Sequence, residues 1–171
     1  MALTQQLARV SLQYLAQCRE TAADSQANAP GWSPPAEDTL DLDWAIWGLI
    51  KVFRWAHIDA AHTNALERSI TGGTGGDIGF LDHPEVYDGF GAPPALLPPE
   101  LVTEIAHALD AIDVSKAIAQ LPEDSAEAAR ACGFEGFDGN LPAYLGQHFD
   151  ALRDFYHSAS RRRLAVVTWV D

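Results

Sequence analysis

The last apolar run of the chain reads LAVVTWV, residues 164–170, and it decides the fold class. Its β-branched and aromatic side chains favour a pleated, packed strand. Because apolar residues fill consecutive positions, we expect both faces of this strand to be covered and the strand to lie inside its sheet. The three arginines at 161–163 come directly before it. They are typical of the charged C-terminal end of a helix.

A second strand is predicted at the other end of the chain. Residues 2–10 alternate loosely with a period of two, the pattern of a strand whose two faces differ. Helices that lie between two terminal strands cannot form a doubly wound sheet. We therefore predict an α+β fold in which several helices pack on a small sheet that includes the N- and C-terminal strands.

The clearest helical pattern covers Leu40 to His57. Its apolar residues recur at spacings of three and four, and Asp41 or Asp43 can cap its start. Its three tryptophans widen the apolar surface beyond one stripe, which indicates a helix buried on more than one side. We expect Trp44 and Phe53 on the buried side.

Turn and capping signals divide the rest of the chain. Ser11 is the expected N-cap of a first helix, and Gly72 with Gly73 should end a short helix over residues 62–70. The other expected segments are a loop over 21–38, a short strand near 95–97, a helix opening at Pro98-Pro99, helical pieces over 113–120 and 123–131, a turn over 133–140 and a long amphipathic helix over 141–160.

Charge excludes two classes of partner. The 171 residues carry 24 acidic and 11 basic side chains, a formal net charge of -13. Nucleic-acid affinity depends mainly on Lys and Arg that neutralise phosphates, and this surface repels phosphates instead. We therefore expect no nucleic-acid partner and no binding to anionic membranes. An unknown small molecule or a protein remains as the expected partner.

The cysteines and the apolar runs indicate the compartment. Cys18 and Cys132 lie far apart and form no CxxC pair, and residues 1–9 show no basic leader followed by an apolar run. No stretch approaches the roughly 18 apolar residues of a membrane span. The expected setting is the cytoplasm.

The glycine run TGGTGGD at residues 71–77 is not a phosphate loop. A P-loop needs Lys followed by Ser or Thr after its glycines, and Asp77 stands there instead. The run is interpreted as a helix stop and a turn. No nucleotide or other cofactor is predicted.

Metal sites are equally poorly supported. His57, Asp59 and His62 gather near the end of the central helix, but an expected helix break separates them, whereas a metal site needs three or four converging ligands. Glu104 and His107 have the i, i+3 spacing of di-metal bundles, which use two such motifs, and only one copy occurs here. No metal is predicted.

The tryptophan group is the remaining feature. Trp44 and Trp47 are three residues apart and share a helix face, where core packing is the usual reason for such residues. The alternative is an aromatic-walled cleft beside the glycine-rich loop 71–92, with histidines that offer polar contacts. The candidate ligand-binding residues are Trp44, Trp47, His57, His62 and His83.

The order of these segments resembles a known family. A VS cap at Val10-Ser11 opens the first helix, and Asp41 to Trp44 leads into the central helix. An IxGG turn, a FGAPPALLPPELVTEIAHALDAI segment and a final helix from Tyr144 to Ala159 follow. In this order and over essentially the whole chain, 1–171, the sequence is similar to the YfbM-like bacterial family, a domain of unknown function. The resemblance implies an α+β fold and a bacterial cytoplasmic protein, and it implies no reaction.

Two classes of function remain open. The first is a non-catalytic binding or interaction protein, which the acidic charge and the lack of any complete catalytic set favour. The second is a small hydrolase or transferase whose site is assembled from distant residues around the aromatic cleft. No GxSxG motif is present, and both cysteines are expected to be structural thiols near helix ends rather than reactive ones.

Overall fold

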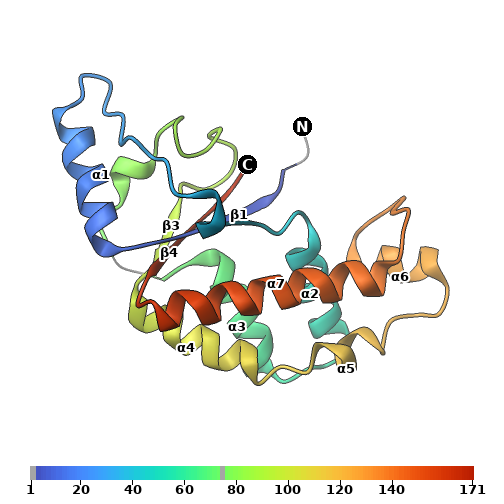
Figure 1. Ribbon diagram of the computed structural model, residues 1–171. Coiled ribbons are helices and arrows are strands. Elements are labelled where there is room, and N and C mark those ends of the chain that lie inside the picture. The colour runs from blue at the N-terminus through green and yellow to red at the C-terminus, as the bar shows by residue number, and fades with distance from the viewer. Residues whose placement is uncertain (1–2, 74–75) are drawn as a thin grey trace.

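The two ends of the chain lie side by side at the centre of one antiparallel sheet (Figure 1). The computed structural model describes residues 3–73 and 76–171. Within those residues there are seven α-helices and four strands, with the strand order β2-β1-β4-β3. The strands are β1 (Gln5–Val10), β2 (Thr39–Asp41), β3 (Ala95–Leu97) and β4 (Ala165–Val170). The helices are α1 (Leu12–Asp24), α2 (Ala45–Trp55), α3 (Ala60–Thr71), α4 (Pro99–Asp110), α5 (Val114–Ile118), α6 (Ser125–Cys132) and α7 (Leu141–Arg161), with short 3-10 turns η1 (Ala36–Asp38) and η2 (Gly79–Leu81).

The predicted α+β class and the placement of both terminal strands in the sheet are confirmed. The strands β1 and β4 pair over their whole length, from Gln5 opposite Val170 to Val10 opposite Ala165. Each has a second neighbour, β2 for β1 and β3 for β4, so neither forms an edge. Beyond the paired strands, the backbone N–H of Asp171 still donates to the carbonyl of Thr4 at 3.0 Å.

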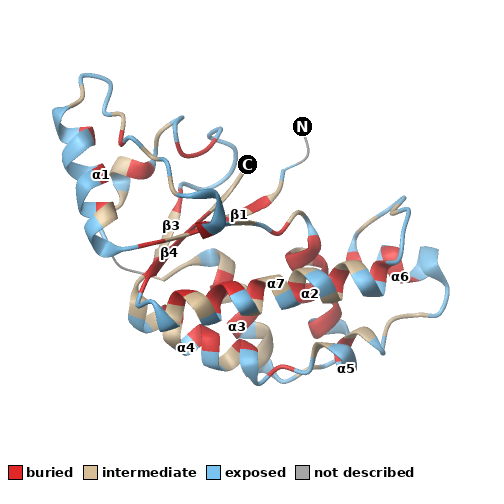
Figure 2. Cartoon of the chain, viewed as in Figure 1, coloured by how far each residue is buried: buried red, intermediate tan, exposed pale blue. Residues whose placement is uncertain are grey.

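Both faces of this central pair are covered. Successive side chains of a strand point to opposite faces, so neighbouring residues enter different cores. Leu7 and Val166 belong to the large core formed with α2 to α7. Ala8 and Val167 belong to a smaller core formed with α1 and the segment around η2. Figure 1 shows α1 on one side of the sheet and the remaining helices on the other, and Figure 2 shows buried positions along the facing surfaces.

The central helix is shorter than predicted. Thr39–Asp41 forms the edge strand β2 against β1, with Leu40 opposite Leu7, and helix α2 begins only at Ala45. The expected caps are also wrong. Asp41 Oδ1 instead accepts a hydrogen bond from the Asp43 backbone N–H at 2.7 Å, and the N-cap is Trp44, whose side chain makes no capping bond.

Of the two residues expected on the buried side of this helix, one is buried. Phe53 is fully buried, in a stripe with Ile46 and Leu49 at spacings of three and four. Trp44 is 40% exposed, so that part of the prediction was wrong. Trp44 precedes the first residue of the helix, so the helical period does not determine which way its side chain points.

Most of the other segments match the sequence patterns. Ser11 caps α1, because its Oγ accepts a hydrogen bond from the Tyr14 backbone N–H at 3.0 Å. The helix α1 extends to Asp24, into the expected loop 21–38. Gly72 ends α3 with a φ of 77°, as a helix stop requires, while the Thr74-Gly75 part of the glycine run lies outside the described residues. The short strand near residues 95–97 is β3. No helix among residues 3–73 and 76–171 is long and apolar enough to cross a membrane.

A buried carboxylate joins the sheet to the end of α7. Asp38, only 7% exposed, accepts a hydrogen bond from Arg9 Nε of β1 at 2.7 Å. Its second oxygen accepts from Nη2 of Arg162, the residue that follows α7, at 3.0 Å. Hydrogen bonds from Arg162 and then from Arg9 outweigh the effect of burial and hold the pKa of Asp38 below its usual value.

Truncation of Phe53 to Ala should lower the free energy of unfolding by about 3–5 kcal/mol, because it opens a cavity in the large core. Trp55→Ala, on the same helix at a side chain 49% exposed, is the matched control and should cost less than about 1 kcal/mol. Urea denaturation at neutral pH measures both. Equal losses for the two variants would contradict the placement of the buried face.

Asp38→Asn should destabilise the protein by about 2 kcal/mol at pH 7 and by much less at acid pH. The depressed pKa means that the ionised carboxylate stabilises the fold above the pKa of about 4 of the unfolded chain, and that this contribution is lost as the pH falls through the lower pKa of the folded state. Urea denaturation of wild type and variant at a series of pH values measures the difference. Asp150→Asn, which breaks an exposed pair with Arg153, is the control and should change stability by less than about 0.5 kcal/mol throughout. A loss from Asp38→Asn that is independent of pH would contradict the role of the charge.

Candidate functional site

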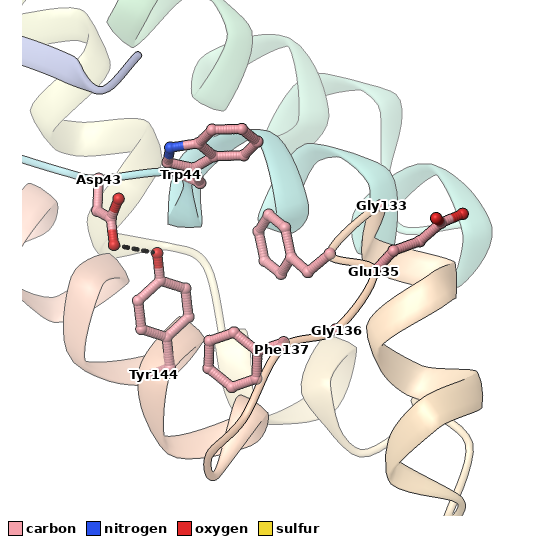
Figure 3. Close-up of a pocket in the computed structure, with 8 residues that line it drawn as sticks. Asp43, Trp44, Gly133, Glu135, Gly136, Phe137 and Tyr144 are labelled. Carbon is pink, nitrogen blue, oxygen red and sulfur yellow. Dashed lines mark hydrogen bonds between the residues drawn. The ribbon is translucent and has the colours of Figure 1, made fainter. Parts of the chain in front are cut away.

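A hollow opens where the β2–α2 turn, the loop 133–140 and the first turn of α7 meet (Figure 3). It encloses about 510 Å³. We call this hollow the aromatic cleft. Its lining residues are Asp43, Trp44, Gly133, Phe134, Glu135, Gly136, Phe137 and Tyr144.

Tyr144 is placed at the base of the cleft by the start of α7. Asn140 caps this helix by accepting the Ala143 backbone N–H at 3.0 Å, and Tyr144 follows in the first turn. The Tyr144 hydroxyl donates a hydrogen bond to Asp43 Oδ2 at 2.9 Å. Burial, and after it the bond to Asp43, raises the pKa of Tyr144 well above its usual value. The phenol therefore keeps its proton and fixes the carboxylate by donating to it.

The rings of the cleft pack against one another. The Phe137 and Tyr144 ring centroids lie 5.1 Å apart, and Phe134 is 6.1 Å from each of them. His148 lies on the Tyr144 ring at 4.5 Å, and its Nδ1 is 2.8 Å from the Tyr144 carbonyl oxygen. In Figure 3 the Trp44 indole lies on one side of the hollow, with Tyr144 and Phe137 on the other.

Two glycines allow loop 133–140 to reach this position. Gly133 ends α6 in the left-handed conformation, with a φ of 77°, which turns the chain toward α2. Gly48 lies on α2 where Phe134 seats, because a Cβ at this position would be 2.5 Å from Phe134 Cζ. The Phe134 ring thus occupies the space that any other residue at 48 would need. The loop is positioned by this contact and by the ring of Phe137 on Tyr144.

The charges around the cleft are mainly negative. Asp43 and Glu135 both line it, and neither forms an ion pair with any residue in the described ranges 3–73 and 76–171. Asp43 sits in the turn before α2 with a φ of 49°, a conformation that Asp and Asn tolerate better than most residues. Lys51 covers Gly133, the end of the cleft away from Asp43 in Figure 3.

The structure assembles only part of the candidate site predicted from the sequence. Trp44 lines the cleft, and Trp47 supports it from the partly buried side, with ring centroids 6.1 Å apart and planes at 77°. His57 follows α2, exposed and with a φ of 51°, and His62 lies in the first turn of α3. His83 lies in the segment after η2, where its Nδ1 accepts the Glu85 backbone N–H at 3.1 Å. None of these histidines lines the cleft, and nor do the described residues of the loop 71–92.

Metal-binding and nucleophilic groups are not gathered at the cleft. No cluster of three His, Cys, Asp or Glu side chains suited to a metal ion occurs in residues 3–73 and 76–171. Glu104 forms an ion pair with Arg68 at 3.5 Å. Both cysteines are free and buried, and burial raises the pKa of the Cys132 thiol to about 11. A thiol with that pKa is protonated at neutral pH and is a poor nucleophile.

Of the eight residues that line the cleft, only Trp44 was a candidate from the sequence, and seven were missed. Asp43 was interpreted as a helix cap, and Phe134, Phe137 and Tyr144 as parts of a turn and an amphipathic helix. The available signal was the glycine-flanked aromatic pattern GFEGF at residues 133–137. That pattern does not say which helix the rings meet, since Asp43 and Tyr144 are separated by 101 residues along the chain.

Comparisons with known proteins agree with the resemblance seen in the sequence. A family described as "Domain of unknown function (DUF1877)" matches residues 1–169. No curated protein matches the chain. The fold is similar to that in "The Crystal Structure of a Protein of Unknown Function YfbM from Escherichia coli", with a TM-score of 0.58 and 15% sequence identity over 98% of this chain and 99% of that chain. At this identity the similarity concerns the fold alone.

Replacement of Gly48 by Ala should displace the Phe134 ring and destabilise the protein by about 1–3 kcal/mol. Gly146→Ala is the matched control, because it also lies within a helix but its Cβ would be an ordinary 3.7 Å from Ile118 Cδ1. This control should be neutral or stabilising by up to about 1 kcal/mol. Chemical denaturation measures both variants.

The clash can be tested separately from helix propensity. In a Phe134→Ala background, Gly48→Ala should lose most of its cost, because the ring that it would meet is gone. An unchanged cost in that background would contradict the proposed seat of Phe134 on Gly48.

Proposed function

The chain belongs to the DUF1877 family, a domain of unknown function, and we propose that it is a non-catalytic binding protein whose ligand enters the aromatic cleft. The observation that carries the proposal is the cleft itself. Four aromatic side chains, one of them Tyr144 with its hydroxyl, and the Asp43 carboxylate converge on a hollow of about 510 Å³. Small-molecule sites are concave, mostly apolar and supplied with a few fixed polar groups, with volumes of roughly 300–1,000 Å³.

The exposure of Trp44 supports a binding role. This ring is 40% exposed although it adjoins a large core, and Trp47 packs edge-on against it. Tryptophan buries a large area when a partner covers it, so an indole held at the rim of a hollow is suited to recognition. Because the hollow is concave, a small molecule fits it better than a flat protein surface does.

The chemistry of the polar groups favours binding over catalysis. Tyr144 retains its proton and donates it to a hydrogen bond with Asp43, so it acts as an anchor rather than a nucleophile. For the Nδ1 of His148 to bond the Tyr144 carbonyl oxygen it must carry the proton, and the ring then supports Tyr144. The alternative, a small hydrolase or transferase, would use this same cleft.

Setting and partners are part of the same proposal. Two free, buried cysteines suit a reducing cytoplasm. The net charge of -13 makes nucleic acid and anionic membranes unfavourable partners.

The proposal is tested by NMR with the indole N–H resonances of the five tryptophans. Small neutral, anionic and cationic aromatic fragments are titrated, and Trp44→Phe assigns the Trp44 signal. At least one fragment should shift the Trp44 signal saturably, while Trp32 and Trp169, which pack together in the smaller core, stay unchanged. Phe137→Ala should weaken that binding at least threefold, because it removes one wall.

Two results would count against the proposal. If no fragment of any charge shifts Trp44 preferentially, the cleft is not a ligand site. If a bound compound is converted on incubation, and Tyr144→Phe abolishes the conversion, the hydrolase or transferase alternative replaces the binding protein.

A further inference from the structure

We propose that the occupant of the aromatic cleft is an organic cation that carries an alkylated ammonium group. This inference rests on the proposed function, since it names the ligand class of the same cleft. It follows from three features of the described residues: the aromatic rings that line the hollow, a carboxylate without a cationic partner, and the negative net charge of the protein.

The walls of the cleft suit a cation. The face of an aromatic ring carries negative charge density, and ammonium groups bind over such faces, with quaternary ammonium groups commonly held by several rings at once. Trp44 lies on one side of the hollow, and Phe134, Phe137 and Tyr144 form a cluster with centroids 5.1 to 6.1 Å apart. Rings packed this closely leave little room to rotate, so the hollow keeps its shape in the absence of a ligand.

The carboxylate of Asp43 is held but not neutralised. Its Oδ2 accepts the Tyr144 hydroxyl, and no hydrogen bond from the described residues reaches Oδ1. The turn with a φ of 49° and the bond from the Asp43 N–H to Asp41 Oδ1 fix the backbone, so the free oxygen stays at the edge of the cleft. A half-buried anion of this kind is stabilised when a cation approaches.

The surrounding charges favour the same ligand. Asp41, whose Oδ1 accepts the Asp43 backbone N–H, adds negative charge beside Asp43, and the protein as a whole carries -13, which attracts cations from a distance. Lys51 is the basic group next to the cleft, and it covers Gly133 at the opposite end from Asp43. An anionic ligand in the cleft would meet the Asp43 carboxylate and four aromatic rings.

The test compares choline with its neutral isostere 3,3-dimethylbutan-1-ol, which has the same shape and hydroxyl but a carbon atom in place of the charged nitrogen. Both are titrated into the full chain while the Trp44 indole N–H is followed by NMR. Choline should bind saturably and at least about tenfold more tightly than the isostere, as a cation–π site with a nearby carboxylate requires.

Variants separate the charge of Asp43 from its structural role. Asp43→Asn keeps an oxygen for the Tyr144 hydroxyl and tolerates the left-handed turn, so the fold is retained while the charge is removed. It should weaken choline binding about tenfold and leave the isostere unchanged. Asp82→Asn is the matched control, because Asp82 also accepts a tyrosine hydroxyl, from Tyr87 at 2.7 Å, outside the cleft. This control should leave both affinities unchanged.

The outcomes distinguish this inference from the proposed function. Equal affinity for choline and the isostere, or no effect of Asp43→Asn on choline binding, overturns the proposal of a cationic ligand. The cleft then remains a ligand site. If neither compound shifts the Trp44 signal, the proposal of a cationic ligand is also overturned. The proposed function fails only when no fragment of any charge shifts that signal. Phe137→Leu provides a second measurement that keeps the bulk of the wall, and loss of choline binding there supports the role of the π face.

Discussion

The antiparallel pairing of β1 with β4 is the constraint on which the rest of the structure depends. It joins the two ends of the described chain. The segment between them must therefore leave this strand pair after β1 and return to it at β4. The register sends Leu7 and Val166 into the large helical core and Ala8 and Val167 into the smaller one. A slip of one residue would exchange these two sets between the two cores.

This pairing also sets the position of the aromatic cleft. The strand β2 pairs with β1, and α7 is followed directly by β4. The β1–β4 pair therefore fixes the positions of both β2 and α7. Asp38 precedes β2 and binds Arg162 at the C-terminal end of α7, whereas Asp43 follows β2 and binds Tyr144 near its N-terminal end. The two aspartates therefore tether both ends of one long helix to one edge of the sheet. The hydrogen bond between Asp43 and Tyr144, which lies in the cleft, is one of these two tethers, so the contact that holds α7 in place also positions the polar groups of the site.

The sequence predicts what local pattern controls and misses what distant pairing controls. Local residue types alone predict three features, and each lies where the pattern placed it: the strand in the run 164–170, the helix stop at Gly72 and the short strand near 95–97. Leu40 and Asp41 were assigned to the central helix because the strand conformation of Thr39–Asp41 depends on pairing with β1, 30 residues or more away in the chain. Trp44 was found as a candidate from composition, but the rings and the carboxylate that complete its hollow come from loop 133–140, α7 and a backbone turn. No spacing rule links them.

The difference between the two aspartates beside β2 is the strongest argument for a ligand. Both lose hydration, but Asp38 is compensated by two guanidinium groups, which lower the pKa of its carboxyl. Asp43 receives one neutral hydroxyl and sits among rings that supply no positive charge. If it served the fold alone, an asparagine would meet the same turn and accept the same hydroxyl at a smaller desolvation cost. A carboxylate in this position becomes favourable when a cation shares the cleft with it, and the same cation would cover the exposed face of Trp44.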